Sequence, residues 1–598
     1  MVKKNYILVC GGSACEASKS DAIYESLKKA LYERGLADDV QVVKTGCFGF
    51  CEKGPIVKVL PEEAFYVEVK PEDAEEIVQE TIIKGRLVER LQYKDKNAKS
   101  TGDKFDVEKI GFYQKQLRIV LRNCGFIDPE NIDEYIARHG YQALEKALTE
   151  IGRDGVIEEL KTSGLRGRGG AGFPTWIKWN TTKGVEAPQK YVVCNADEGD
   201  PGAYMDRSTL EGDPHSVLEA MTIAGYTIGA TKGIIYIRAE YPLAIKRLEV
   251  AMKQSREYGL LGENILGTDF SFDIEIRLGA GAFVCGEETA LLRSIEGNRG
   301  MPTPKPPFPA VEGLWHCPTL INNVETYANI PVIIMKGGAW FKTIGTEKSP
   351  GTKVFALTGK INNSGLVEVP MGTTLREIVY EIGGGIRNGK AFKAVQTGGP
   401  SGGVITTENL DTGIDFDALA KIGSMMGSGG MIVMSEEDCI VDVVKFYMEF
   451  CGDESCGKCS PCRIGTRKLL NYLTKISKGN GTMEDLKKME EIGYAMKKAA
   501  LCGLGQTAAN PVLSTMRYFK DEYIQHVVDK KCIAGKCTSL VRFEIDPAKC
   551  IGCTLCARRC PAGAVSGEKK QAHKIDQAKC VKCGECFRGC KFGAISKF

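Results

Sequence analysis

The spacing of the cysteines constrains this chain more than any other feature of its sequence. The chain has 24 cysteines among 598 residues, and most of them stand in runs separated by two or three residues. The first residues, Met1–Cys10, lack the apolar length and the cleavage site of a secretion signal. Without such a signal, runs of this kind indicate metal ligands and not disulfides. The fold must therefore bring several groups of thiolates together around metal.

The last part of the chain carries the most specific run. Its cysteines are spaced C-x2-C-x2-C-x3-C, the first run is followed by Pro561, and the same spacing recurs further along. In two-cluster bacterial ferredoxins the fourth cysteine of each run ligates the other cluster. We therefore expect one 4Fe-4S cluster at Cys550, Cys553, Cys556 and Cys590. A second 4Fe-4S cluster is expected at Cys580, Cys583, Cys586 and Cys560.

A third run lies inside a stretch whose apolar periodicity is helical from Cys439 to His526. Its members are Cys456, Cys459 and Cys462, with the spacing C-x2-C-x2-C. Three thiolates at this spacing surround one cubane cluster and need a distant fourth ligand. The run predicts a 4Fe-4S cluster, and zinc is the alternative.

The first part of the chain carries two cysteine pairs at the ends of predicted strands. They are Cys10 with Cys15 and Cys47 with Cys51. The order of strand, helix and strand places both pairs on loops that can converge. Four thiolates suit either a 2Fe-2S cluster or zinc, and two unrelated pairs are the remaining alternative.

One further set precedes the last run. Cys532-x4-Cys537 follows His526 closely, which is a loose metal-ligand spacing. A Cys/His set of this kind suits a closed tetrahedral zinc site, and Cys451 is the expected fourth ligand. Such a site would anchor the root of the ferredoxin tail. The alternative is a surface loop with two free thiols and an unrelated histidine.

Glycine-rich and acidic segments between Gly164 and Thr326 indicate backbone wrapped closely around a polar ligand. The first contains Gly167-x-Gly169-x-x-Gly172, which matches the dinucleotide fingerprint on paper. That fingerprint needs a strand before it, whereas residues 156–161 have a helical pattern. We therefore expect a phosphate-cradling loop of another kind, with a structural turn cluster as the alternative.

These segments, in order, resemble the flavin- and NADH-binding subunit of respiratory complex I and its soluble relatives, from about Glu150 to Pro511. The resemblance implies FMN reduced by hydride from a nicotinamide. Residues at matching positions would hold FMN: Gly167, Gly169, Lys178, Asn195, Asp197, Gly286, Asn322 and Asn323. Others would meet the nicotinamide nucleotide: Phe173, Glu198, Glu288, Lys305 and Phe308, with Glu287 and Glu288 along the cofactors.

The same resemblance assigns further roles. Glu198 and Glu288 are the expected catalytic residues, and Cys502 is the implied fourth ligand of the middle cluster. Asp200 stands where relatives usually carry Glu, and Thr181 where some carry an aromatic residue, so the choice between NAD and NADP stays open. The N-terminal part resembles the thioredoxin-like 2Fe-2S ferredoxins, which implies a 2Fe-2S cluster at its four cysteines.

The expected fold class is α/β multidomain. Helix is predicted from residue 106 to Ile151, including the apolar spacing of Leu117, Val120 and Leu121. Thr352 to Met434 alternates β-rich runs with one helix, as in a β-grasp domain. The predicted domains are thioredoxin-like 2Fe-2S (1–92), linker (93–105), Rossmann-like FMN- and NAD(H)-binding (106–345), β-grasp (346–435), helical 4Fe-4S (436–530), linker with a zinc site (531–545) and two-cluster ferredoxin (546–598).

Charge and hydropathy exclude other classes. The chain holds 79 basic against 76 acidic residues, a net charge of +3, so no electrostatic argument favours nucleic acid or an anionic membrane. No apolar run approaches the ~18–20 residues that span a bilayer. The expectation is a cytoplasmic protein.

The inventory of cofactors indicates the function. A hydride carrier delivers two electrons, whereas each cluster accepts one, so a flavin is needed between them. A chain that combines a flavin core with an N-terminal 2Fe-2S domain and a two-cluster tail resembles the flavin subunit of soluble, multimeric, NAD(P)-linked FeFe hydrogenases, including electron-bifurcating ones. The resemblance implies three partners, namely an FeFe-hydrogenase catalytic subunit, a small thioredoxin-like 2Fe-2S subunit and soluble ferredoxin. The expected cofactors are FMN, NAD(P)(H), one 2Fe-2S cluster, three 4Fe-4S clusters and zinc.

Two other functions remain open on the sequence. The same module could serve an NAD-dependent formate dehydrogenase complex, since only the partner chain differs. From another class, the chain could be an electron-transfer scaffold with a degenerate flavin site. The intact glycine-rich loop and Asn322-Asn323 argue against the scaffold.

Overall fold

The computed structural model describes residues 5–93 and 110–597. The chain divides into two compact units, each with its own core. The first unit comprises residues 1–389 and 394–433, and the second comprises residues 390–393 and 434–598. The predicted linker, residues 93–105, lies outside the described residues except for residue 93.

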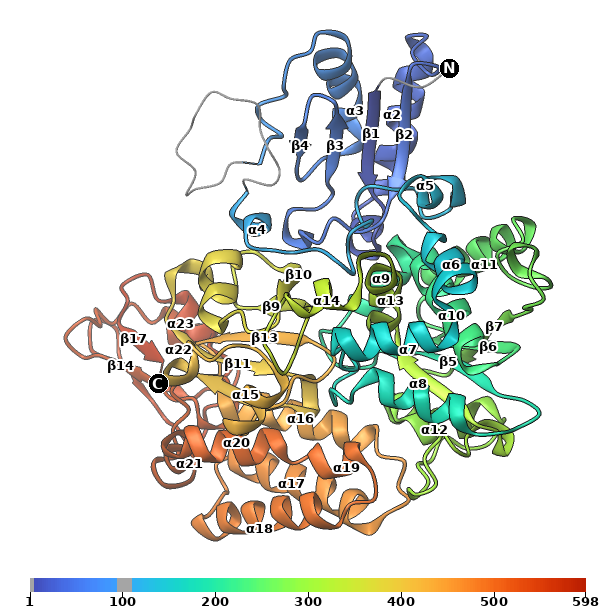
Figure 1. Cartoon of the computed structure of the whole chain (residues 1–598). Helices are drawn as coiled ribbons and strands as arrows, with labels where there is room; N and C mark the ends of the chain where they lie inside the picture. Colours follow the sequence, from blue (N-terminus) through green and yellow to red (C-terminus); the bar gives the residue numbers. More distant parts are fainter. Residues whose placement is uncertain (1–4, 94–109, 598) are drawn as a thin grey trace. The chain divides into compact units, whose positions relative to one another are not determined.

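The first unit begins with a four-stranded sheet of order β2-β1-β3-β4 (Figure 1). Its strands are β1 (Asn5–Cys10), β2 (Val40–Thr45), β3 (Val57–Leu60) and β4 (Ala64–Tyr66). Strands β1 and β2 are parallel, and the other pairs are antiparallel. Helices α1 (Ser13–Ala17) and α2 (Ser20–Glu33) follow β1, and Ile23 and Leu27 of α2 pack against Ile7 and Val9. After β4, the helical segment contains α3 (Ala74–Glu76) and a π-helical turn (Ile77–Ile83).

The helix predicted from residue 106 to Ile151 is present only in pieces. They are α4 (Gly111–Gln114), α5 (Ile132–Ala137), α6 (Gln142–Lys146) and a π-helical turn (Ala147–Ile151). Around Val120 the prediction is wrong, because the backbone N–H groups of Ile119, Val120 and Leu121 all donate to the buried Glu368 carboxylate at 2.9 Å. Those donors would otherwise need intrahelical partners.

The part of the chain that follows, which we call the flavin core after its expected ligand, is a four-stranded parallel sheet of order β7-β6-β5-β8. Its strands are β5 (Tyr191–Ala196), β6 (Lys232–Arg238), β7 (Asp273–Gly279) and β8 (Thr319–Asn323). Strands β5 and β6 read as nearly continuous apolar runs, as expected for a parallel sheet covered on both faces. The chain moves outward from β5 to β7 and then returns to place β8 on the other side of β5. The strand order therefore reverses between β5 and β8.

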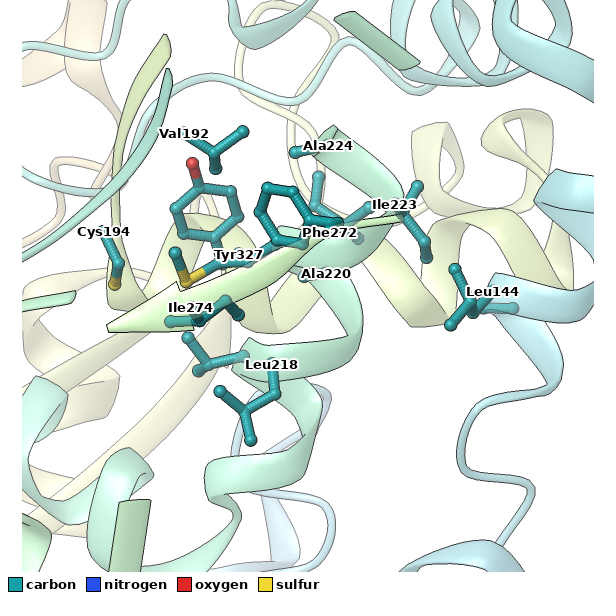
Figure 2. Packing of buried hydrophobic residues seen from close by; sticks show 14 of the residues in the cluster. Leu144, Val192, Cys194, Leu218, Ala220, Ile223, Ala224, Phe272, Ile274 and Tyr327 are labelled. Carbon is teal, nitrogen blue, oxygen red and sulfur yellow. The ribbon is translucent and has the colours of Figure 1, made fainter. Parts of the chain in front are cut away.

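Eight helices belong to this core. They are α7 (Gly152–Ser163), α8 (Thr175–Gly184), α9 (Met205–Gly212), α10 (Pro214–Ile228), α11 (Pro242–Glu257), α12 (Glu288–Ile295), α13 (Val324–Lys336) and α14 (Gly338–Lys342). Helix α10 is buried along nearly its whole length, and its buried Glu219 accepts from the Tyr135 hydroxyl at 2.6 Å. Figure 2 shows its residues Ala220 and Ile223 in one apolar cluster with Val192, Phe272 and Tyr327.

The first unit ends with a mixed five-stranded sheet of order β10-β9-β13-β11-β12. Its strands are β9 (Thr352–Gly359), β10 (Gly365–Pro370), β11 (Phe392–Thr397), β12 (Val404–Thr406) and β13 (Gly430–Ser435). The predicted helix in this region is present as a π-helical segment over Glu377–Ile382, and α15 (Phe416–Lys421) follows β12. The glycines at 384, 385, 398 and 399 all have positive φ, as turn positions require.

The second unit begins with a helical bundle. Its helices are α16 (Ile440–Asp453), α17 (Ser460–Ser477), α18 (Met483–Ala499), α19 (Gly503–Thr507), α20 (Asn510–Tyr518) and α21 (Lys520–Ile524), followed by a π-helical turn (Gln525–Asp529). In the described residues no helix is both long and apolar enough to cross a membrane.

The unit ends with two similar halves, each a short helix beside short strands (Figure 1). The elements are β14 (Phe543–Ile545), α22 (Leu555–Arg559), β15 (Val565–Ser566), β16 (Lys574–Ile575), α23 (Glu585–Gly589) and β17 (Ile595–Lys597). Strand β14 pairs with β17, so the first and last strands of the repeat close on each other. The α/β multidomain fold class is confirmed.

Candidate functional site

The residues expected to hold FMN gather at the carboxyl edge of the parallel sheet. Asn195 of β5 and Asn323 of β8 are register partners on neighbouring parallel strands. The strand order reverses between these two strands, and ligands of open α/β sheets bind outside the carboxyl ends at such a point. The sheet topology therefore places a binding crevice where the sequence placed its amide side chains.

Asn195 fixes one side of this crevice. Its Nδ2 donates to Gly286 O at 2.9 Å, and its Oδ1 accepts from Asp197 N at 3.1 Å. A Cβ on Gly286 would stand 3.3 Å from Asp197 O, so the backbone at Gly286 runs close to the end of β5. Asp197 in turn lies 3.5 Å from the Arg238 guanidinium. This side of the crevice is a tight, hydrogen-bonded cradle.

Asn322 and Asn323 fix the other side. Asn322 Oδ1 accepts from the buried indole of Trp179 at 2.9 Å, which fixes the orientation of its amide. Asn323 Oδ1 caps α13, and its Nδ2 donates to Asp206 at 2.5 Å. A Cβ on Gly169 would stand 3.1 Å from Asn323 Cβ. The glycine-rich loop thus passes directly over the end of β8.

That loop follows a helix, as predicted, because α7 ends at Ser163 and α8 begins at Thr175. Gly167 N donates to Phe173 O at 2.8 Å, which closes the loop on itself. Arg168 is fully buried and binds the carbonyls of Pro350 and Thr352, so its charge fastens the loop and is not presented to a ligand. The rings of Phe173 and Phe308 are about half exposed.

Lys178, Glu288 and Lys305 form one ion-paired group. The Glu288 carboxylate lies 2.9 Å from Lys178 Nζ and 2.5 Å from Lys305 Nζ, and Lys305 also lies 3.1 Å from Glu287. Burial alone would raise the pKa of Glu288, but the two ammonium groups lower it to about 2. Glu287 caps α12 by accepting from Thr289 N and Ala290 N. A phosphate at Lys178 would therefore share this lysine with an ionised Glu288.

Glu198 is buried and binds the start of α9. Its carboxylate accepts from the backbone N–H of Asp206 at 3.2 Å and of Arg207 at 3.1 Å. Burial raises the pKa of Glu198 to about 7, and burial together with Glu198 raises the pKa of Asp206. Asp206 also accepts from Asn323. Glu198, expected at the nicotinamide nucleotide, and Asn323, expected at FMN, therefore belong to one hydrogen-bond network.

Asp200 lies beside the five-stranded sheet's loops. Its Oδ2 accepts from Ser428 Oγ at 2.5 Å, and a Cβ on Gly399 would stand 2.7 Å from its Oδ1. Burial raises the pKa of Asp200 to about 6. Asp200 therefore joins two parts of the first unit, a contact that its sequence context did not indicate.

The four N-terminal cysteines converge. Cys10 ends β1 and Cys47 follows β2, and the thiol of Cys10 is within hydrogen-bonding reach of Cys15 and Cys47. Cys47 Sγ and Cys51 Sγ lie 3.8 Å apart. Cys15, Cys47 and Cys51 line a cavity of about 220 Å³ together with Tyr204, Arg207 and Ser208 of the flavin core. Four converging thiols beside a cavity fit a 2Fe-2S cluster.

The cysteines expected to hold the 4Fe-4S cluster of the helical bundle lie at the starts of two helices. Cys459 precedes the first turn of α17 and Cys502 precedes that of α19. Helix α19 packs against α17, since a Cβ on Gly505 would stand 3.2 Å from Cys462 Cβ. Ser455 Oγ lies 3.3 Å from Cys462 Sγ. The fold thus carries the distant Cys502 loop to the three-cysteine run.

The structure brings together one of the two crossed cysteine sets expected in the tail. One cavity is lined by Cys550, Cys553 and Cys556 of the first run and by Cys590 of the second. In the other set, backbone N–H groups donate to sulfur, from Ala564 to Cys560 at 3.2 Å and from Lys582 to Cys580 at 3.4 Å. N–H donors of this kind stabilise the negative charge of a thiolate-bound cluster.

A separate group of four buried ligands lies at the root of the tail. Its members are Cys439, His526, Cys532 and Cys537, whose ligand atoms all lie within 4.8 Å of one another. Cys439 Sγ is 3.3 Å from His526 Nε2 and 3.8 Å from Cys537 Sγ, and Cys537 Sγ is 3.5 Å from Nε2. Zn–S bonds of about 2.3 Å and Zn–N bonds of about 2.0–2.1 Å in a tetrahedron separate the ligand atoms by about 3.5–3.8 Å. The spacing fits tetrahedral zinc.

The surroundings of His526 support the same interpretation. Its Nδ1–H donates to the Glu522 backbone carbonyl at 2.7 Å, which leaves the Nε2 lone pair facing the thiols. The Glu522 carboxylate accepts from Ile440 N at 2.9 Å and pairs with Lys393 at 2.8 Å. The ligand and the start of α16 are therefore held by one residue.

The prediction of Cys451 as the fourth ligand is wrong, because the fourth member of the group is Cys439. Cys439 immediately precedes α16, whereas Cys451 stands near the end of that helix. Twelve residues of α-helix separate two positions by about 18 Å, so one site cannot use both. One sequence signal could have identified Cys439. Cys439 and His526 stand at the two ends of the predicted helical stretch, and the first and last helices of a bundle can lie side by side.

Comparisons with known proteins agree with this arrangement. Residues 160–332 match the Nuo51 FMN-binding domain, and residues 442–526 match the NADH-ubiquinone oxidoreductase-F iron-sulfur binding region. Residues 1–82 match the thioredoxin-like [2Fe-2S] ferredoxin family, residues 354–405 the SLBB domain, and residues 549–594 the 4Fe-4S dicluster domain.

Several relatives match most of the chain. The NADP-reducing hydrogenase subunit HndC of Solidesulfovibrio fructosivorans is 62% identical over 77% of this chain and 94% of its own length. An NADH-quinone oxidoreductase subunit of Rhizobium meliloti is 45% identical over 69% of this chain and 98% of its own length. A solved NAD+-reducing [NiFe]-hydrogenase aligns with a TM-score of 0.61 and 28% identity, over 88% of this chain and 85% of that one. The chain belongs to the Nuo51 family of flavin-binding, iron–sulfur NADH oxidoreductase subunits.

Proposed function

We propose that the chain exchanges hydride with NAD(P)(H) at the flavin core and passes single electrons along its iron–sulfur centres to a separate hydrogenase subunit. The observation that carries this proposal is the convergence of Asn195, Gly286 and Asn323 at the switch point of the parallel sheet. The name of the HndC relative supports a hydrogenase partner. The intact cradle argues against a scaffold with a degenerate flavin site.

The residues of the cradle have separable roles. Lys178 would neutralise phosphate charge, and the Asn195, Asn322 and Asn323 amides would bind ribityl hydroxyls. The ionised Glu288 holds Lys178 and Lys305 in place until a ligand arrives. A bound flavin supplies the conversion between a two-electron hydride and single electrons.

Replacing Lys178 by alanine should weaken flavin retention. The change removes charge-assisted contacts worth roughly 1.5–3 kcal/mol each, or about 10- to 100-fold in affinity. FMN released from the denatured protein, counted per chain, measures this. Lys183→Ala is the matched control, because Lys183 is on the same helix and pairs with the exposed Asp154. Full FMN content and full diaphorase activity in Lys178→Ala would show that the site is assigned wrongly.

The pH dependence of NAD(P)H oxidation should report Glu198. Its buried carboxyl has a pKa of about 7, so the carboxylate form grows as pH rises through that value. A carboxylate stabilises the positive charge that develops on a nicotinamide ring as hydride leaves, so the rate should rise with pH. Glu198→Gln keeps a hydrogen-bond acceptor for α9 and should flatten the profile while FMN stays bound. An unchanged profile in Glu198→Gln would remove Glu198 from the chemistry.

The cluster complement and the zinc ion are part of the same proposal. One 2Fe-2S and three 4Fe-4S clusters would hold about fourteen iron atoms per chain, which iron analysis of the reconstituted chain can count. Zinc at Cys439, His526, Cys532 and Cys537 would pin the root of the tail. The clusters would then have a fixed attachment point on the helical bundle.

Electron bifurcation, which couples NAD(P)+ and ferredoxin to hydrogen, is supported by the cluster domains that precede and follow the flavin core in the sequence. The tail also suits an acidic carrier: residues 541–597 hold twelve Lys and Arg against five Asp and Glu, whereas the whole chain is nearly neutral. Nearly all of these basic residues are exposed. Hydrogen oxidation by the assembled complex should require oxidised ferredoxin and NAD(P)+ together. Equal rates with either acceptor alone would exclude bifurcation.

A further inference from the structure

The cavity beside the N-terminal cysteines is not built from the ferredoxin-like domain alone. Gly12–Cys15, Cys47 and Cys51 line one part, and Tyr204, Arg207 and Ser208 line the rest. The last three residues belong to the flavin core, at the start of α9. Close backbone contact fixes this arrangement, because a Cβ on Gly46 would stand 2.4 Å from Gly212 Cα at the end of α9. The flavin core therefore closes the cysteine pocket.

Tyr204 touches a predicted cluster ligand. Its hydroxyl donates to Cys51 Sγ at 3.7 Å, within the range of hydrogen bonds to sulfur. The Tyr204 side chain is held by Arg207, whose guanidinium lies 5.7 Å from its ring centroid. This donor comes from outside the domain that supplies the cysteines.

Arg207 brings a positive charge to the same cavity. Its Nε is buried and makes no hydrogen bond within the described part of the chain, and the Glu211 carboxylate lies 3.7 Å away. Glu211 is itself held by Ser13, whose Oγ donates to it at 2.6 Å. The guanidinium is thus fixed beside the cysteines with part of its hydrogen-bonding capacity unused.

The backbone at the start of α9 connects Tyr204 and Arg207 to Glu198, the acid expected at the nicotinamide nucleotide. Glu198 accepts from Arg207 N, and Tyr241 donates from its hydroxyl to Glu198 O at 2.7 Å. Arg207 stacks over the Tyr241 ring as well, at 5.4 Å. One helical turn therefore contacts the expected nucleotide site through its N–H groups and the cysteine pocket through its side chains.

We propose that Tyr204 and Arg207 complete the 2Fe-2S site and raise its reduction potential. This inference rests on the proposed 2Fe-2S centre at Cys10, Cys15, Cys47 and Cys51. Reduction adds one negative charge to a thiolate-bound cluster, so a hydroxyl donor to sulfur and a nearby cation stabilise the reduced state more than the oxidised state. Both residues act through the ligand set and are positioning residues.

The test is a redox titration of the full-length chain, monitored by the electron paramagnetic resonance signal of the reduced 2Fe-2S cluster. Tyr204→Phe removes the donor and keeps the ring, and we expect the equilibrium constant for cluster reduction to fall about tenfold. For a one-electron couple this corresponds to about 59 mV towards more negative potential. Arg207→Met should shift the potential in the same direction, and Arg207→Lys should restore most of it.

Tyr113→Phe is the matched control. Tyr113 is a half-buried phenol beside the same cysteine loop, but its hydroxyl donates to the Phe48 carbonyl at 3.0 Å and not to sulfur. Its removal should leave the potential unchanged. An unchanged potential in Tyr204→Phe, or an equal shift in Tyr113→Phe, would overturn the inference.

A second measurement detects the hydrogen bond to sulfur directly. Resonance Raman spectra of the wild-type chain in H2O and D2O should show a deuterium shift in an Fe–S(Cys) stretching band, and Tyr204→Phe should lose part of it. Absence of that difference would also overturn the inference. If the wild-type chain has no 2Fe-2S signal at all, the proposed centre itself is wrong, which is a distinguishable result.

Discussion

Replacing Cys439 by alanine should remove zinc from the purified chain. Cys439, His526, Cys532 and Cys537 are all buried and their ligand atoms lie within 4.8 Å of one another, so the loss of one thiolate would leave zinc with three ligands. Structural zinc binds with an apparent free energy of about 10–16 kcal/mol in small zinc domains, so the effect on the root of the tail should be large. Metal analysis of the variant measures zinc per chain directly.

Cys451→Ala is the matched control for this result. Cys451 is a buried cysteine on α16, the helix that Cys439 precedes, but it stands near the other end. Its substitution should leave one zinc per chain. X-ray absorption at the zinc edge should show three sulfur ligands and one nitrogen ligand. Zinc retained in Cys439→Ala, or lost in Cys451→Ala, would contradict the site.

Replacing Lys353 by methionine should destabilise the flavin core. Lys353 is fully buried on β9, and its ammonium binds the Glu325 carboxylate and the carbonyls of Val354 and Ser428 at 2.8 and 2.6 Å. Removing it leaves the buried Glu325 charge without its cation, which costs about 3–5 kcal/mol. Glu325 stands in the first turn of α13, close to Asn323, so we expect FMN to be released at lower temperature.

Arg376→Met tests whether any lost ion pair has this effect. Arg376 pairs with Asp411 on the surface, where both side chains are exposed, so its loss should leave the free energy of unfolding nearly unchanged. The double variant Lys353→Met/Glu325→Gln should recover part of the lost stability, because it removes both buried charges. If FMN were released at the same temperature from Lys353→Met and Arg376→Met, the buried Lys353–Glu325 pair would not be what stabilises the flavin core.

The sequence predicted the parts of the fold whose signals are local. The cysteine runs carry their ligand geometry in their spacing, and the tail's crossed set at Cys590 follows from the repeat. The helical segment before the glycine-rich loop was also predictable, because α7 has an apolar face at helical spacing. These signals do not depend on distant residues.

Long-range contacts account for what the sequence could not predict. Glu368 takes three backbone N–H groups near Val120 and so prevents the helix that the apolar spacing favoured. The choice of Cys439 over Cys451 depends on how the helical bundle closes. The role of Tyr204 depends on the packing of two domains, and nothing in its own sequence context indicates a contact with Cys51.

In the proposed electron path, one chain takes hydride from NAD(P)H and delivers single electrons to its clusters. Anaerobic stopped-flow spectroscopy of the reconstituted chain, mixed with NADH or NADPH, tests it most directly. We expect one FMN per chain, rapid bleaching of the flavin absorbance and then bleaching of the iron–sulfur absorbance. Both phases should be lost when FMN is removed and restored when it is added back. Clusters that stay oxidised beside a reduced flavin, or that are reduced equally well without FMN, would contradict it.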